Sequence, residues 1–294
     1  MHGVLLLDKL PGITSNDSLQ HIKRIYQANK AGHTGNLDKP ASGLLPICFG
    51  EATKFTSFLL NADKRYVARC QLGIETATGD SEGKIIRERP IPQLVEEDLE
   101  ATLQTFMGTI DQIPPMFSAL KQNGQRLYKL AYQGIEVKRE PRRITIYKNI
   151  LVEFTGEQFE IEVACSKGTY IRTLVTDIGN ALGCGAHIIS LRRTATGPFH
   201  ENNMISVMSI CNLAEQGLDA IDELLLPIDA VIHGIPEVVL TDSVSSFIGQ
   251  GQAVMVAHAP TEGILRIYNE NRDFLGIAEV LDDGRITPRR MVRH

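Results

Sequence analysis

A change of hydrophobic period between residues 159 and 182 constrains the fold more than any other feature of the sequence. Phe159, Ile161, Val163 and Cys165 alternate with more polar residues, the two-residue period of a strand buried on one face. After Gly168, apolar residues recur at helical spacing, at Ile171, Leu174, Val175, Ile178 and Leu182. The sequence therefore predicts a half-buried strand, a turn, and an amphipathic helix that stops at Gly183. Residues 168–172 lie at the strand-to-helix junction, where side chains often face a cleft.

The remaining patterns predict an α/β (α+β) protein whose central mixed or antiparallel sheet is flanked by helices. Residues 4–7 form a buried strand, and Thr14 or Ser15 caps a helix that buries Leu19, Ile22 and either Ile25 or Tyr26. Further patterns predict a helix opening at 50–54, a strand at 63–73, a turn at 78–83 and a helix at 96–107. Residues 226–236 form a linker, and strand-like runs at 238–240, 254–256, 264–268 and 274–280 form a small all-β unit of about 60 residues.

Composition excludes several classes of protein. No apolar run approaches the roughly 18 residues of a membrane helix, and the apolar run at 4–7 is too short for a signal peptide, so we expect a cytoplasmic protein without membrane contact. The five cysteines are widely spaced and include no Cys-x-x-Cys pair, which favours reduced thiols. Cys184 and His187 form a single Cys-x-x-His pair, which we interpret as structural because structural zinc needs four ligands. We expect neither a metal nor a cofactor.

The net charge of −5 argues against binding nucleic acid over the whole surface, but clustering of cations on one face matters more. Basic residues gather at 64–65, 138–143, 192–193 and 289–293. Each group alone is compatible with a solvated surface. Four such groups in an acidic chain indicate a polarised surface that can face RNA.

Residues 30–46 form the segment in which we expect the chemistry. This segment contains Gly32, Gly35 and Gly43, two prolines, His33 and Asp38, without a helical or strand period. Glycines allow backbone angles that other residues avoid, so such a loop can fix one side chain in a cleft. Asp38 can equally serve only to shape a local turn. The segment lacks the Gly-Lys-Ser/Thr ending of a phosphate-binding loop.

The order His-Thr-Gly-x-Leu-Asp, followed by Ala-Ser-Gly-Leu-Leu-Pro, resembles the catalytic loop of the TruB family of tRNA pseudouridine synthases. Further motifs follow the family order: Asp-Lys-Leu-Pro-Gly-Ile-Thr-Ser at 8–15, Lys-Arg-Tyr at 64–66, Gly-Thr-Tyr-Ile-Arg at 168–172 and Leu-Arg-Arg at 191–193. Two departures occur. Lys39-Pro40 replaces the family's Pro-Leu after the aspartate, and Pro11 lies one position late. A proline restricts the residue before it, so we expect a slightly looser but active loop.

The resemblance implies a pseudouridine synthase fold over residues 1–230, with an RNA-gripping insertion at about 109–147, and a PUA-like RNA-binding barrel over 236–294. A plain surface excursion remains the alternative for 109–147. The implied reaction isomerises uridine-55 in the T-loop of tRNA to pseudouridine, without a cofactor, on a base that is flipped out of the RNA. The implied partner is the tRNA T-arm stem-loop, and we expect a monomer.

The resemblance also assigns roles to individual residues. Asp38 is the nucleophile, and it acts on the base or begins chemistry at the sugar. Arg172 keeps Asp38 ionised and orients it through a bidentate pair. Tyr66 stacks on the flipped uracil, and Tyr170 lines the same pocket and handles the proton at C5. The resemblance further implies that His33 fills the gap in the RNA stack or contacts the flipped nucleotide, and that Leu191 closes the apolar side of the pocket. We expect Lys9 to support either the loop or the region of Asp8, without taking part in the chemistry.

Two other functions are compatible with part of these features. A non-catalytic tRNA-binding or tRNA-folding protein would use the C-terminal unit and the basic groups, with Asp38, Tyr66 and Arg172 serving structure only. A pseudouridine synthase acting on another RNA would share the catalytic motifs. The length of the chain and the 109–147 segment favour the bacterial-type tRNA enzyme.

Overall fold

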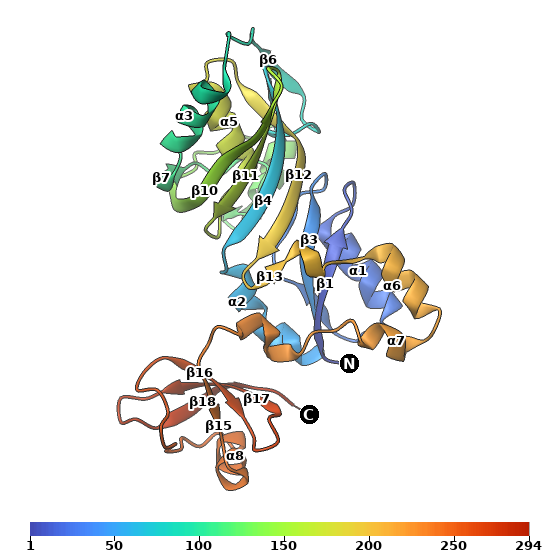
Figure 1. Cartoon of the computed structure of the whole chain (residues 1–294), viewed down its shortest axis with the longest axis vertical. Coiled ribbons are helices and arrows are strands. Elements are labelled where there is room, and N and C mark those ends of the chain that lie inside the picture. Colours follow the sequence, from blue (N-terminus) through green and yellow to red (C-terminus); the bar gives the residue numbers. More distant parts are fainter. Residues whose placement is uncertain (294) are drawn as a thin grey trace.

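The computed structural model describes residues 1–293, which form a large mixed sheet and a small C-terminal unit (Figure 1). Ten strands make up the large sheet. Eight of them follow one path across it: β14 (Ile205–Ser206), β1 (Gly3–Lys9), β3 (Ser42–Phe49), β12 (Ala186–Thr196), β4 (Lys64–Leu72), β11 (Gln158–Cys165), β10 (Arg142–Phe154) and β7 (Gly108–Gln112). Two short strands lie off this path: β2 (Ala31–His33) pairs with β3, and β13 (Phe199–His200) pairs with β12.

Strand direction and the flanking helices confirm the predicted class. The pairs β1–β14 and β12–β3 are parallel, and the other pairs of this sheet are antiparallel. The helices of this part of the chain are α1 (Ser15–Ile25), α2 (Thr56–Leu60), α3 (Glu96–Thr105), α4 (Leu127–Tyr132), α5 (Ile171–Ala181), α6 (Val207–Ala214) and α7 (Leu218–Asp222). The helix expected to open at Gly50 is the 3-10 helix η1 (Gly50–Phe55), which leads into α2. A second 3-10 helix, η2 (Glu201–Asn203), and two hairpins, β5 (Ile74–Thr76) with β6 (Ile85–Glu88) and β8 (Lys121–Gln122) with β9 (Gln125–Arg126), complete it.

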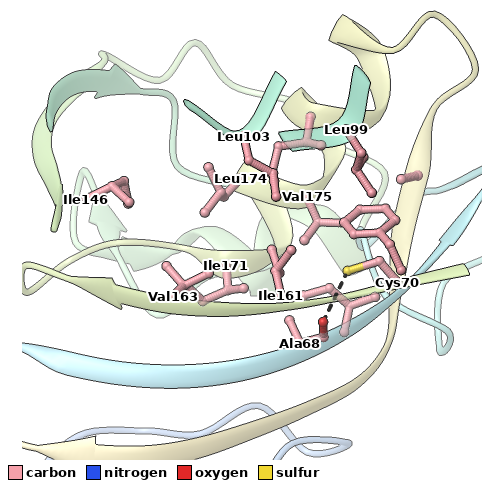
Figure 2. Packing of buried hydrophobic residues seen from close by; sticks show 14 of the residues in the cluster. Ala68, Cys70, Leu99, Leu103, Ile146, Ile161, Val163, Ile171, Leu174 and Val175 are labelled. Atoms are coloured by element: carbon pink, nitrogen blue, oxygen red, sulfur yellow. Dashed lines mark hydrogen bonds between the residues drawn. The ribbon is translucent and has the colours of Figure 1, made fainter. Parts of the chain in front are cut away.

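The first core lies between the sheet and the helices α3 and α5 (Figure 2). The inward residues of β11, among them Ile161 and Val163, alternate with less buried ones, as the sequence predicts. Leu103 of α3 and Leu174 of α5 are fully or almost fully buried against them. Because α5 packs its apolar face on the sheet, the position of its first residues is fixed relative to the strands.

The second core lies under α1, α6 and the strands β1 and β3. Thr14 is the N-cap of α1, because its Oγ1 accepts a hydrogen bond from the amide of Asp17 at 3.0 Å. Tyr26 follows the helix, is buried, and donates its hydroxyl to the carbonyl of Ile221 at 2.8 Å. These contacts fix α1, which carries one of the anchors of the Asp38 loop.

The C-terminal unit differs from the all-β expectation. Its sheet contains β15 (Glu237–Val239), β16 (Ile264–Tyr268), β17 (Phe274–Val280) and β18 (Ile286–Met291). It also contains α8 (Asp242–Gly249), which was not predicted because its three serines weaken the helical pattern. Ile248 of α8 is nevertheless fully buried on the sheet. The strand expected at 254–256 is only an isolated bridge between Val254 and Ile286.

The predicted linker at 226–236 is part of a packed interface. It contains the 3-10 helix η3 (Ile228–Ile232), whose Val231 and Ile232 are buried in a core shared by both units. The rings of Phe55 and Phe274 lie 5.5 Å apart across this interface. Apolar contact therefore fixes the C-terminal unit against the large one, and the predicted linker is part of that contact.

The ends of the 109–147 segment belong to the sheet. Residues 108–112 form β7, and β10 begins at Arg142, with Arg142 opposite Gln112. The part that leaves the sheet is thus residues 113–141, which we call the excursion. It contains the β8–β9 hairpin and the helix α4.

Candidate active site

Asp38 lies on the loop of residues 34–41, which connects β2 to β3. Ser15 of α1 anchors this loop twice: its Oγ accepts from the amide of Leu37 at 2.8 Å and donates to the Leu37 carbonyl at 3.1 Å. Leu37 is buried, whereas the side chain of Asp38 is 43% exposed. The loop thus buries one residue as an anchor and presents the next to solvent.

Lys9 supports the same loop from behind. Its side chain is completely buried and its ammonium donates to the carbonyls of Leu10 at 2.9 Å, Ile13 at 2.8 Å and Lys39 at 3.4 Å. Burial lowers the pKa of Lys9 to about 8, although the nearby charge of Asp38 opposes the shift. Lys9 is absent from the cleft lining, so its position is one of support for the residue that follows Asp38.

Arg172, at the start of α5, is the partner of Asp38. Its Nε lies 2.8 Å from Asp38 Oδ2. The expected bidentate pair does not form, because the terminal nitrogens donate elsewhere: Nη1 to the carbonyl of Thr78 and Nη2 to that of Phe117, each at 2.8 Å. The guanidinium is therefore held from three segments and presents one N–H to the carboxylate. These three contacts hold Arg172 more firmly than a bidentate pair with the exposed Asp38 alone would hold it.

Asp80 is a site residue that the sequence did not reveal. Its carboxylate is buried, with Oδ2 at 3.8 Å from Arg172 Nε. Its Oδ1 accepts from Thr78 Oγ1 at 2.5 Å and from the amide of Glu82 at 3.1 Å. In sequence these residues indicate only a turn. An isolated bridge between Asp80 and Ile188 of β12 brings the turn to the site, a long-range contact without a local signal.

A cleft of about 960 Å³ opens in front of this pair. Six of the seven predicted site residues line it: His33, Asp38, Tyr66, Tyr170, Arg172 and Leu191. A smaller hollow between Asp38, Asp80 and Leu191 adjoins it. Residues separated by more than 150 positions in sequence thus meet around one carboxylate.

The two tyrosines of the cleft are firmly placed. Tyr66 is on β4, opposite Arg193 of β12 in the register of the sheet. Tyr170 precedes α5, and the buried side chain of Gln112 clamps its backbone: the Tyr170 amide donates to Oε1 at 2.8 Å and Nε2 donates to the Tyr170 carbonyl at 3.1 Å. Burial raises the pKa of both tyrosines, so both phenols are neutral at neutral pH.

His33 enters the cleft from β2 with a buried Nδ1 that has no hydrogen-bond partner within residues 1–293. Burial, reinforced by the charge of Arg193, lowers the pKa of His33. The imidazole is therefore neutral at pH 7 and suits contact with a base or sugar better than with a phosphate.

The excursion forms an aromatic rim to the cleft. The ring of Tyr132 meets those of Phe117 and Tyr128 edge-on, with centroids 5.5 Å and 6.4 Å apart. All three residues line the cleft, and Tyr132 is 79% exposed. This cluster could not be predicted from the sequence, because its members are spaced irregularly and meet only in the folded excursion.

Cations outnumber acids in the cleft, although the chain carries a net charge of −5. The basic residues of the lining are Lys39, Lys64, Arg126, Arg172 and Arg193, and the acidic ones are Asp38, Asp80 and Glu82. Elsewhere, several cations of the predicted basic groups are paired with carboxylates, among them Arg192, which takes both oxygens of Asp8 at 3.0 Å. The positively charged feature is therefore the cleft, which includes Lys64 and Arg193 from two of the predicted groups.

Two searches of the described residues gave negative results. Across residues 1–293, no group of three or more His, Cys, Asp or Glu side chains is placed to hold a metal ion. Within the same residues, no helix is long and apolar enough to cross a membrane.

Comparison with known proteins gives matches over almost the whole chain. Residues 23–171 match the family model described as TruB family pseudouridylate synthase (N terminal domain). Residues 172–233 match the model of the tRNA pseudouridylate synthase B C-terminal domain, and residues 236–292 match that of pseudouridine synthase II TruB, C-terminal.

Individual relatives agree with these models. A tRNA pseudouridine synthase B of Coxiella burnetii is 52% identical over 292 residues, covering 99% of this chain and 94% of the relative. One of Nitrosococcus oceani is 50% identical, covering 99% and 95%. Among solved structures, a Cbf5-Nop10-Gar1 complex contains a chain that is 27% identical with a TM-score of 0.76, covering 98% of this chain and 84% of that one.

Proposed function

The chain belongs to the TruB family of pseudouridylate synthases, and we propose that it isomerises uridine-55 in the T-loop of tRNA to pseudouridine, with Asp38 as the nucleophile. Its relatives named tRNA pseudouridine synthase B support the coarser statement, that it is an isomerase forming pseudouridine in tRNA. The observation that carries the finer proposal is the carboxylate of Asp38, bound by Arg172 at 2.8 Å and open to a large cleft.

The contacts of Asp38 suit a nucleophile. An attacking carboxylate must be ionised and oriented, and the N–H of a buried guanidinium favours both conditions. Arg172 is in turn fixed by two carbonyls, so it cannot turn away when the substrate enters. The exposed side of Asp38 remains free to approach the nucleotide.

The walls of the cleft suit a uracil that has left the RNA stack. Extrusion costs a few kcal/mol, and stacking on an aromatic side chain returns about 1–3 kcal/mol. In our proposal the base lies against Tyr66, with Leu191 on its apolar side and the neutral imidazole of His33 beside the RNA. All three residues line the same cleft.

The reaction rearranges bonds without net addition. The bond from N1 to the sugar C1′ breaks, the uracil rotates, and a bond from C5 to C1′ forms. The proton on C5 must leave, and N1 gains one. We assign the C5 proton to Tyr170. Because burial raises its pKa, the phenol is neutral, so its oxygen accepts the C5 proton while its own proton passes to water, and N1 takes up a proton from water. The bond that Asp38 forms during the reaction breaks before pseudouridine is released, which regenerates the carboxylate.

The substrate and setting follow from the same proposal. The excess of cations in the cleft favours the phosphate backbone of the T-arm. We also propose that a monomer is active, and we place it in the cytoplasm, where tRNA is modified.

The first experiment incubates the protein with an unmodified T-arm stem-loop, without added cofactor or metal, and maps pseudouridine. A stem-loop with cytidine at position 55 is the matched control RNA, and Asp38→Ala is the control protein. We expect product at position 55 only, and only with the native protein. Binding without product would favour a tRNA-binding or tRNA-folding protein, and product confined to other RNAs would favour a different substrate.

A further inference from the structure

Arg193 is a buried cation without a carboxylate partner. It lies on β12 and is 1% exposed. The other buried arginines, Arg172 and Arg266, each lie within 4.0 Å of two carboxylates. Within residues 1–293, no Asp or Glu oxygen comes that close to the Arg193 guanidinium. A buried charge without a counter-ion is costly, so its position requires an explanation.

Three hydrogen bonds of the Arg193 side chain go to backbone carbonyls before and after Asp38. Nε donates to the carbonyl of Leu44 at 2.7 Å. Nη1 and Nη2 donate to the carbonyls of Asn36 and Gly35, each at 3.4 Å. One planar guanidinium therefore spans the chain before and after Asp38, which the single ammonium of a lysine cannot do in the same way.

The backbone of Arg193 supports the same loop. Gly43 pairs with Arg193 between β3 and β12 and has a φ of +96°. A Cβ at Gly43 would lie 2.4 Å from the Arg193 carbonyl oxygen. The end of the loop is therefore pressed against the strand that carries Arg193, and both its main chain and its side chain set the position of the loop.

We infer that Arg193 is a positioning residue for Asp38: its guanidinium ties Gly35 and Asn36 of the 34–41 loop to Leu44 of β3, so that the carboxylate stays on Arg172. The inference rests on the proposed function for its kinetic consequence, but the loop contacts exist without it. Arg193 does not touch Asp38, so its effect passes through the backbone of Gly35 and Asn36.

The neighbouring Arg192 provides a matched control. It lies on the same strand, but it binds the carboxylates of Asp8 and Glu201 and does not line the cleft. Arg192→Lys therefore changes an arginine to a lysine one position away without touching the loop carbonyls. Loss of the two-nitrogen contact with Asp8 in that variant reports on stability alone.

The test compares Arg193→Lys and Arg192→Lys with the native protein in two assays. The first measures single-turnover pseudouridine formation at saturating stem-loop RNA, together with the Kd for that RNA. We expect a rate on the order of 10- to 100-fold lower for Arg193→Lys, because small displacements of a reacting group have effects of this size, with Kd unchanged. Arg192→Lys should retain the native rate.

The second assay needs no activity. Hydrogen–deuterium exchange of the free proteins should be faster in peptides covering 34–41 for Arg193→Lys only. If Arg193→Lys does not fold, Arg193→Gln, which buries no charge, takes its place. An unchanged rate, a raised Kd at unchanged rate, or unchanged loop exchange would overturn the inference. If the native protein forms no pseudouridine, the proposed function fails, and the exchange result still decides the role of Arg193.

Discussion

The Asp38 loop and the excursion line the same cleft but are built in opposite ways. The loop of eight residues is held by buried donors from three directions: Ser15, Lys9 and Arg193. The excursion of residues 113–141 buries few side chains, and its rim tyrosine, Tyr132, is almost fully exposed. The difference indicates two separate roles: the Asp38 loop holds the reacting carboxylate in a fixed position, and the excursion offers the RNA an adaptable aromatic surface.

One side chain joins the two regions. Arg172 donates from Nε to Asp38 and from Nη2 to the carbonyl of Phe117 in the excursion. A shift of the excursion would therefore displace Arg172, the arginine that orients the carboxylate of Asp38. The hydrogen bond from Arg172 to Phe117 therefore couples the position of the excursion to the position of Asp38.

The largest effect is expected from Arg172→Lys. Lysine cannot bind Asp38, Thr78 and Phe117 from one planar group, so the carboxylate loses its orientation. We expect a single-turnover rate about 100- to 1,000-fold lower, comparable with the loss of one preorganised donor in other enzymes, and little change in the Kd for stem-loop RNA. Rapid-quench assays of pseudouridine formation and filter binding measure the two quantities.

Arg89→Lys is the matched control for this variant. Arg89 also binds a carboxylate, that of Glu75, and a carbonyl, that of Gly183, but it does not line the cleft. Native turnover by Arg172→Lys would contradict the role given to the pair. If Arg172→Lys lost RNA affinity as well as rate, the separation between a catalytic loop and an RNA-binding excursion would be contradicted.

Tyr132→Ala tests the adaptable region. Loss of one stacking surface should weaken RNA binding by about 1–3 kcal/mol and leave the saturated rate unchanged. Because Tyr132 is 79% exposed, its removal leaves the core intact. Tyr147→Ala, at an exposed tyrosine outside the cleft lining, is the control. A lower saturated rate for Tyr132→Ala, with native affinity for RNA, would indicate that the excursion takes part in the chemical step.

The last prediction concerns stability and the support under the loop. Folded Lys9 has a pKa of about 8 against 10.5 as the ordinary value, so between these pH values the unfolded chain binds more protons at this site. The free energy of unfolding should therefore rise with pH in this window, relative to Lys9→Met, which lacks the titrating group. Urea unfolding of both proteins from pH 8 to pH 10.5 measures the difference, and a constant difference would contradict the burial of a charged Lys9.

Local patterns predicted the elements, and motif order predicted most of the site. The alternation at 159–165 and the helical spacing at 171–182 depend on which face of each element is buried, so β11 and α5 could be predicted from sequence. His33, Tyr66 and Leu191 could be named because they stand in recognisable motifs, and the structure brings them to one cleft. Their roles in binding and catalysis remain predictions.

What the sequence could not supply depends on contacts between distant segments. Asp80 and Gln112 reach the site through the folding of a turn and an edge strand, and neither stands in a chemical pattern. The bidentate pair was expected because Arg172 was considered alone with Asp38; the carbonyls of Thr78 and Phe117 occupy its other nitrogens. The helix α8 was missed because burial on the C-terminal sheet outweighs the low helix propensity of its serines.

The central claim is that Asp38 carries the chemistry and contributes little to holding the RNA. Asp38→Asn keeps the shape of the side chain and removes its charge, so the loop contacts of Ser15, Lys9 and Arg193 should survive. The decisive measurement is the Kd for unmodified T-arm stem-loop together with pseudouridine formed in a single turnover by this variant. We predict native affinity and no product. Product formed at a measurable rate by Asp38→Asn, or loss of RNA binding without loss of fold, would contradict the claim.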